Sequence, residues 1–194
     1  LVREKMPRMG DGEPEVDRWG VWLLDQFAQA LAGKRNERGG IFRPGTGSAM
    51  FYIQHAVEIN ASPDGRRKGE FLPANYSPSL FAKVKGPLSI IQSFTAPDLK
   101  KTANGGPLTL EFHNSMFRSE TGIEKVASLV KAFIAMGGHQ LQLNSVNAET
   151  LRDAQSHPER YQNLIVRVWG WSAYFVELDK IYQDHLIRRA EYVM

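Results

Sequence analysis

The order of the predicted elements indicates an α/β fold. Segments 108–113 and 139–144 alternate apolar with polar residues, and 164–178 is rich in β-branched and aromatic residues, so all three are predicted strands. A helix is predicted over 122–136, and strands alternate with helices throughout 108–178. This alternation is typical of domains in which helices cover a sheet.

The first predicted element is a helix from Glu13 to about Gly33. Pro14 suits the first helical turn, and the acidic residues around it suit the positive end of the helix dipole. The apolar residues recur at three- and four-residue steps and form one face: Val16, Trp19, Leu23, Phe27 and Leu31. A charged link and two glycines then divide a helical segment, 1–38, from the remainder, 39–194.

Segment 41–59 is predicted to begin as an irregular strand, and its later residues suit either a strand or a helix. On a strand, Arg43, Gly45 and Gly47 lie on one face. The glycines leave space on that face, and Arg43 brings a cation to it. An arginine in a strand is more often exposed and engaged in a surface salt bridge, so this alternative stays open for Arg43.

A turn and two short helices are predicted in the middle of the chain. In Ser62–Arg66, Pro63 presets φ and Asp-Gly closes the bend. The helices are predicted at 79–84 and 87–95. The second begins at Pro87, where the missing N–H of proline costs no helical hydrogen bond.

The later helices have recognisable N-caps. Thr121 and Glu124 have the spacing of a capping box at the start of the helix 122–136, and two glycines follow the end of that helix. Asn147 and Asp179 are predicted to cap the two helices that follow them, because their side chains accept hydrogen bonds from unpaired N–H groups.

Composition excludes several classes of function. The 194 residues, 42% of them hydrophobic, suffice for one core, and interspersed charges with a net charge of +3 argue against a nucleic-acid partner. No apolar run is long enough for a membrane span, so we expect a cytoplasmic protein. The absence of cysteine excludes disulfides and a cysteine nucleophile on this chain. His113 and His139 lack partners at metal-ligand spacing, so no metal site is predicted.

Gly170 interrupts the predicted strand 164–178 between Trp169 and Trp171. Glycine at such a position commonly marks a bulge or a turn, so a bulged hairpin is one interpretation. The other is chemical. A Cα between two amides can lose a hydrogen atom, and the radical that results is delocalised over the flanking amide groups. The centre must be nearly planar, which a Cβ would hinder, so glycine suits it sterically.

The sequence around and after Gly170 resembles the C-terminal signature of glycyl radical enzymes. The family form is Arg-Val-x-Gly-Tyr-Ser, then a Phe, a Leu and Gln-x-x-Ile-Ile-x-Arg. The corresponding residues of this chain are Arg167-Val-Trp-Gly-Trp-Ser, Phe175, Leu178 and Gln183-Asp-His-Leu-Ile-Arg188. Trp171 and Leu186 replace the family's Tyr and first Ile, and neither change touches the glycine. The resemblance covers roughly residues 39–194.

The resemblance implies the C-terminal part of a ten-stranded α/β barrel, with the glycyl radical loop at its centre. It implies that Gly170 stores the radical after activation by an iron–sulfur S-adenosylmethionine enzyme. It also implies that the radical then passes to a cysteine on a second loop of the parent barrel. Arg43 and Gly47 would face substrate, and the enzyme would be a homodimer. Because residues 1–9 have the character of mid-protein sequence, we expect a piece of a longer chain.

The substrate is expected to be an arylacetate. Three stretches are most similar to the arylacetate decarboxylases, which act on 4-hydroxyphenylacetate, phenylacetate or indoleacetate: residues 42–48, 104–113 and 169–171. Space at Gly47 suits an aryl group, and the Arg43 guanidinium suits a carboxylate. Arg43 would equally suit a sulfonate, so a carbon–sulfur lyase of the isethionate type is an alternative. Further alternatives are an autonomous radical carrier and a structural α/β domain without radical chemistry.

Overall fold

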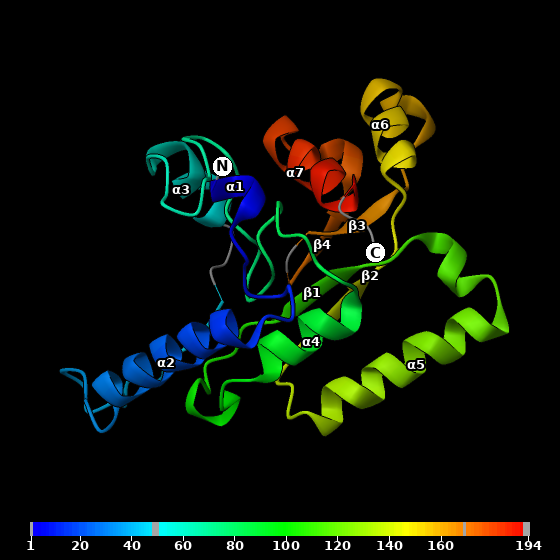
Figure 1. Cartoon of the computed structure of the whole chain (residues 1–194). Helices are drawn as coiled ribbons and strands as arrows, with labels where there is room; N and C mark the ends of the chain where they lie inside the picture. The colour runs from blue at the N-terminus through cyan, green and yellow to red at the C-terminus, as the bar shows by residue number, and fades with distance from the viewer. Residues whose placement is uncertain (1, 48–50, 169, 192–194) are drawn as a thin grey trace.

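A computed structural model describes residues 2–47, 51–168 and 170–191 and confirms a mixed α/β architecture (Figure 1). The helices are α1 (Val2–Lys5), α2 (Pro14–Leu31), α3 (Phe51–Glu58), α4 (Pro87–Thr95), α5 (Glu120–Ala135), α6 (Ala148–Ser156) and α7 (Lys180–Glu191). The strands are β1 (Leu108–Glu111), β2 (Leu141–Asn144), β3 (Ile165–Arg167) and β4 (Ser172–Tyr174). Short 3-10 helices lie at Leu99–Lys101, Asn114–Phe117, Pro158–Arg160 and Phe175–Glu177. The ten-stranded barrel stays a prediction.

Strands β1 and β2 form a parallel pair joined by the α5 crossover. Leu108 pairs with Leu141 and Glu111 with Asn144, and β1 is buried along its whole length. Burial of consecutive residues on both faces is typical of a parallel strand covered by helices. The core here unites residues of α4, β1 and α5: Ile90, Ile91, Phe94, Leu108, Leu110, Phe112 and Phe133.

The C-terminal residues form a second core. Strands β3 and β4 make an antiparallel hairpin, and α6 and α7 pack against one another beside it (Figure 1). The core residues come from α6, the hairpin, the 3-10 helix after it and α7: Leu151, Ala154, Val166, Val168, Phe175, Leu186, Ile187 and Ala190. The β1–β2 and β3–β4 pairs are separate sheets. No ladder of backbone hydrogen bonds therefore fixes one sheet against the other within the described residues.

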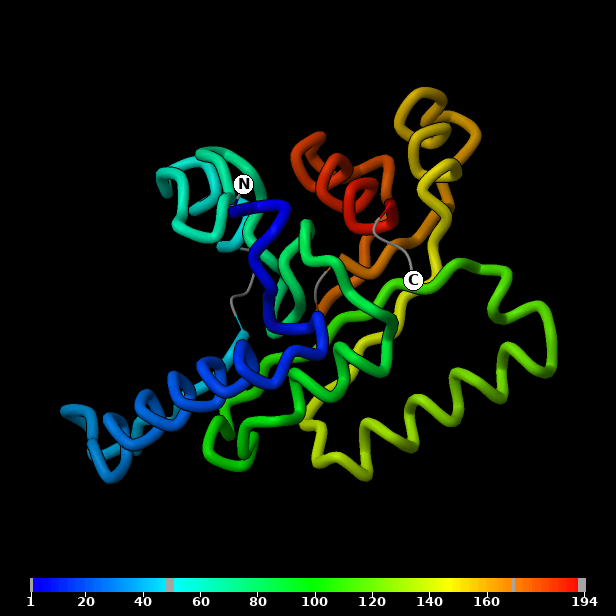
Figure 2. Tube along the Cα trace, viewed as in Figure 1, coloured from blue at the N-terminus to red at the C-terminus, as the bar shows by residue number. Residues whose placement is uncertain are grey.

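Helix α2 extends away from both cores. Figure 2 shows the chain running outward along α2 and returning beside it, where Phe42 N–H donates to Lys34 O. The predicted apolar face of α2 is present, but three of its large members are exposed: Trp19, Leu23 and Phe27. The nearby Trp22 is exposed as well. A hydrogen bond from Ser93 Oγ to Asp17 Oδ2, at 2.8 Å, ties α2 to α4.

The predicted turn at residues 62–66 is confirmed and organises the loop around it. Gly65 has a φ of +95°, and Ser62 N–H donates to Arg66 O at 3.0 Å. The Arg66 side chain is buried and donates to the carbonyl groups of Ile59, Asn60, Arg67 and Glu70. A single guanidinium thus satisfies several carbonyl groups of an irregular segment that has no ladder partners.

Two of the predicted elements are wrong. Segment 79–84 makes a single turn, closed by Ala82 N–H on Ser79 O, because one hydrogen-bonded turn does not repay the cost of helix nucleation. Segment 41–47 is an extended arm rather than a strand. It bonds the turn at 104–105 through Thr46 N–H to Gly105 O, so no strand of the described chain serves as its ladder partner. The ambiguous residues after it form α3.

The predicted cap of α5 is displaced by two residues. Ser119, not Thr121, is the N-cap, because its Oγ accepts from the N–H of Gly122 at 3.1 Å. The Asn147 cap is confirmed, with its side chain accepting from Glu149 N–H. Asp179 precedes α7, and its carbonyl accepts from the N–H of Tyr182.

We predict that Ser119→Ala lowers the free energy of unfolding by about 1 kcal/mol, because one N–H at the start of α5 loses its partner. Thr121→Ala is the matched control and should change stability by less than about 0.5 kcal/mol, since Thr121 is exposed inside the helix. Urea unfolding measures both values. Equal losses in the two variants would contradict the cap assignment.

Candidate functional site

Gly170 lies in the loop of the β3–β4 hairpin. The register pairs Arg167 with Ser172, and beyond that pair Val168 N–H donates to Trp171 O at 3.0 Å. The hairpin therefore turns between Val168 and Trp171, and Gly170 in this loop has a φ of +72°. Such loops require positive φ, which glycine adopts without steric cost. The hairpin interpretation is confirmed, with a turn instead of a bulge.

The side chains around Gly170 give it little cover within this chain. Gly170 is exposed, and no heavy atom lies within 4 Å of the place where a Cβ would sit. Trp171 is 36% exposed and Tyr174 41% exposed, whereas Phe175 is fully buried in the C-terminal core. Trp169 lies outside the described residues. Packing within this chain therefore does not demand a glycine here, whereas the positive φ favours one.

Arg189 of α7 anchors the strand that leads into this loop. Its Nη1 donates to Val168 O and its Nη2 to Arg167 O, both at 2.7 Å. Val168 O accepts no hydrogen bond from the N–H of Trp171, the described residue across the loop. Its hydrogen bond comes from Arg189 instead. The planar guanidinium presents its N–H groups in a fixed fork, which suits two adjacent acceptors.

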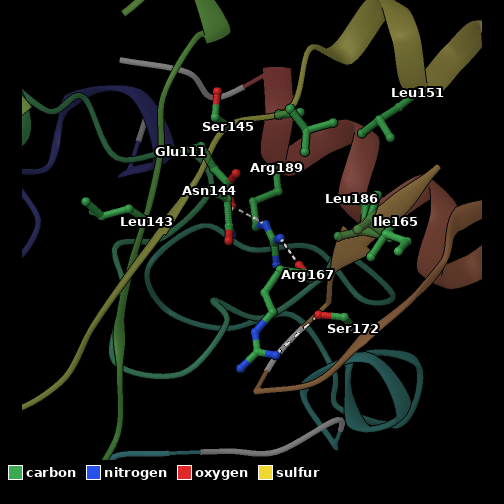
Figure 3. A pocket seen from close by; sticks show the side chains of 13 residues that line it. Glu111, Leu143, Asn144, Ser145, Leu151, Ile165, Arg167, Ser172, Leu186 and Arg189 are labelled. Carbon is green, nitrogen blue, oxygen red and sulfur yellow. Dashed lines mark hydrogen bonds and ion pairs between the residues drawn. The ribbon is translucent and has the colours of Figure 1, made fainter. Parts of the chain in front are cut away.

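The same guanidinium forms a buried ion pair with β1. Arg189 Nε lies 2.5 Å from Glu111 Oε1, and both side chains are 8% exposed. Asn144, at the end of β2, donates from Nδ2 to Glu111 Oε1 at 2.8 Å. Figure 3 shows Arg189 reaching from α7 between Glu111 and Asn144 on one side and Arg167 on the other. The parallel pair and the hairpin therefore meet at one charged group.

A cavity of about 280 Å³ opens beside this network. Glu111, Asn144, Arg167, Ser172 and Arg189 line its polar side. Arg167 Nη1 donates to Ser172 Oγ at 3.3 Å across the hairpin. The space next to the hairpin is thus only partly filled by side chains of this chain.

His185 of α7 lies in a separate aromatic cluster with Tyr52 of α3 and Phe71. Its ring centroid is 4.8 Å from that of Tyr52 and 5.0 Å from that of Phe71, and it is fully buried. Neither ring nitrogen has a hydrogen-bond partner among the described residues. Burial, with a contribution from the nearby Arg189 charge, lowers the pKa of His185 to about 3. The imidazole is therefore neutral.

The predicted substrate residues lie on the extended arm, away from the hairpin cavity. Arg43 is exposed and lines a pocket with the end of α2 and Lys101, and it makes no salt bridge among the described residues. A Cβ at Gly47 would lie 3.6 Å from Gly106 Cα. The pockets lined by Arg43 and by the hairpin are different. The surface salt bridge, which was the alternative for Arg43, is thus not seen in the described chain.

No metal site is visible in the described ranges. They contain no group of three His, Asp or Glu side chains placed to bind an ion. His113 instead places Nδ1 2.9 Å from Ser115 Oγ, and His139 is exposed. In the same ranges, no helix has both the length and the apolar character needed to cross a bilayer.

Sequence reasoning missed Arg189 and Glu111. The stretch compared with the family signature ended at Arg188. The family form Gln-x-x-Ile-Ile-x-Arg has seven residues, so its final Arg corresponds to Arg189 when Gln183 is its first residue. Glu111 carried no such signal, because it lies on the polar side of the alternating strand predicted at 108–113, where an exposed side chain is expected. The motif does not identify a partner for Arg189 either, since Glu111 is far from it in the sequence.

Comparisons with known proteins identify the family of this chain. The family model described as "Glycine radical" matches residues 72–176. The (2S)-3-sulfopropanediol dehydratase of Klebsiella oxytoca is 31% identical over 191 residues, which are 96% of this chain and 23% of that protein. The indoleacetate decarboxylase of Tractidigestivibacter scatoligenes is 33% identical over 187 residues, 96% of this chain and 21% of that protein. The isethionate sulfite-lyase of Nitratidesulfovibrio vulgaris is also similar.

A solved structure shows the same fold. The glycerol-bound B12-independent glycerol dehydratase from Clostridium butyricum matches with a TM-score of 0.92 and 33% identity, over 99% of this chain and 24% of that one. The chain thus spans about a quarter of the length of the relatives it matches. Those relatives catalyse several different reactions at similar identity. The matched model covers more than half of this chain, including the Gly170 loop, and the chain belongs to the glycyl radical family.

Proposed function

We propose that this chain stores a radical on Gly170 as part of a longer anaerobic lyase. The observation that supports this proposal is the position of Gly170 at the tip of a hairpin within the matched region 72–176. Within this chain the tip is exposed, with open space where a Cβ would lie. Loss of one hydrogen atom from this Cα leaves a nearly planar centre that no side chain crowds.

Other parts of the machinery come from outside this chain. The sequence contains no cysteine, so the thiol that reacts with substrate belongs to another segment of the parent protein. We assign activation to an iron–sulfur S-adenosylmethionine enzyme. Residues 39–194 supply the C-terminal part of a ten-stranded barrel, and 1–38 come from the preceding barrel region. The complete enzyme is a cytoplasmic homodimer in this proposal.

The preferred reaction is radical decarboxylation of an arylacetate. Arg43 is exposed and has no salt-bridge partner among the described residues, so its guanidinium is available for a carboxylate. In this proposal Gly47, which has no side chain, faces the aryl group. Relatives that are named decarboxylases, of indoleacetate and of 4-hydroxyphenylacetate, are 33% and 34% identical.

A sulfonate lyase of the isethionate type is the second candidate. An unpaired arginine suits a sulfonate as well as a carboxylate, since both present oxygens to the guanidinium fork. The relatives include a sulfopropanediol dehydratase and an isethionate sulfite-lyase.

We expect Gly170→Ala in the complete protein to abolish the doublet electron-spin signal that anaerobic activation of the wild type produces. Alanine at a φ of +72° also costs roughly 1–2 kcal/mol of stability. Gly137→Ala is the matched control, because Gly137 has a φ of +78° and equally open surroundings. Both variants bear the same strain, and only Gly170→Ala should lose the signal. A doublet in Gly170→Ala would exclude Gly170 as the radical site.

The reaction class is tested by anaerobic turnover with indoleacetate, 4-hydroxyphenylacetate, phenylacetate and isethionate in parallel. We expect carbon dioxide and the decarboxylated aryl product from one of the arylacetates. Sulfite from isethionate, without carbon dioxide from any arylacetate, would replace decarboxylation by carbon–sulfur cleavage.

We predict that Arg43→Ala raises KM for the acidic substrate by about tenfold or more, because one charge-assisted contact is lost. The radical yield should not change, since Arg43 does not line the hairpin cavity. Arg38→Ala, at an exposed arginine just before the arm, is the control. If the two variants have the same KM as the wild type, Arg43 does not bind substrate.

A further inference from the structure

We propose that Arg189 is the positioning residue of the Gly170 loop and that its ion pair with Glu111 fixes this position relative to the parallel sheet. The proposal rests on the proposed storage of a radical at Gly170. It concerns a residue that touches neither substrate nor the radical centre and acts only through the backbone of the hairpin. Every contact on which it depends lies among the described residues.

The backbone just before the loop is held by packing and by hydrogen bonds. Apolar packing of β3 ends at Val168, which is 1% exposed, and Gly170 has no neighbour within 4 Å on its Cβ side. The carbonyl groups of Arg167 and Val168 are the ones that Arg189 binds. The direction in which the chain leaves the core toward Gly170 is therefore set at these two peptide groups.

Side-chain packing within this chain does not by itself fix the position of the outer part of the hairpin. The cavity of about 280 Å³ runs along Arg167 and Ser172, so the chain supplies no close-packed wall there. Close packing fixes the position of neighbouring groups, and beside this part of the hairpin this chain does not supply it. Arg189 supplies polar contacts from the side of α7, as Figure 3 shows.

Arg189 also connects the hairpin to the core formed by α4, β1 and α5. The two sheets share no backbone pairing, and the residues of the two cores are different sets. Glu111 belongs to β1, and Asn144 of β2 binds the same carboxylate oxygen that faces Arg189. The guanidinium thus transmits the position of the parallel strands to the carbonyl groups before Gly170.

The fork geometry makes the role specific to arginine. Lysine carries the same charge but concentrates its donors at one atom, so it cannot reproduce Nη1, Nη2 and Nε contacts at three separate acceptors. A purely electrostatic role would tolerate lysine, whereas a positioning role would not. Arg188 is exposed and next to Arg189 in sequence, so it offers the matched control.

The test uses the complete, anaerobically activated enzyme with Arg189→Lys, Glu111→Gln and the control Arg188→Lys. Radicals per protomer are counted from the doublet, and kcat per radical and KM are measured together with the thermal midpoint. A displacement of about 1 Å in a reacting group costs on the order of a hundredfold in rate. We expect Arg189→Lys to lower kcat per radical by about tenfold to a hundredfold, with KM unchanged. Arg188→Lys should match the wild type.

Glu111→Gln keeps a hydrogen-bond acceptor but removes the counter-charge, so a smaller fall of kcat per radical in the same direction is expected. If Arg189→Lys does not fold, this variant decides the outcome. If the variant that folds, Arg189→Lys or otherwise Glu111→Gln, has the same kcat per radical as the wild type, the positioning role is overturned. An equal loss in Arg188→Lys would overturn it too. A wild-type enzyme without a doublet would instead refute the proposed function of Gly170, which separates the two failures.

Discussion

The structure depends on one buried ion pair, between Arg189 of the last helix and Glu111 of the first strand. A buried charge pair is favourable only when its remaining hydrogen-bonding groups are also satisfied. Here the carboxylate accepts from Asn144, and the guanidinium donates to two backbone carbonyl groups. Removing one partner from such a pair generally costs about 3–5 kcal/mol, because the other charge stays buried. The network therefore constrains the relative position of the two halves of the chain.

Those halves are built by different packing rules. In the β1–α5–β2 unit, β1 is buried on both faces and β2 is mostly half-buried, whereas the C-terminal hairpin buries one face against α6 and α7. The hairpin can be small because its core residues sit on the buried side only. Its outer residues stay exposed in this chain, and these include Gly170. The relatives are about four times as long as this chain.

Helix boundaries were predictable where local chemistry decides them. Pro87 begins α4, and Asn147 caps α6 through its own side chain, because both signals act within one helical turn. Ser119 displaced Thr121 as the cap of α5, since both residue types suit the position and local sequence does not rank them. The arm 41–47 has the composition of a strand but bonds a turn at 104–105, because a strand needs a partner that sequence does not identify.

From the residues alone, a β segment interrupted at Gly170 could be predicted, with a bulged hairpin as one interpretation, because β-branched and aromatic residues flank the glycine. The sequence by itself also determined membership of the family, through the run that follows that glycine. The hydrogen bonds from Arg189 to the hairpin and its ion pair with Glu111 became apparent only in the folded structure. The reason is physical, because a charge enters the interior only where a partner from a distant segment meets it, and the meeting depends on the packing of every element between them.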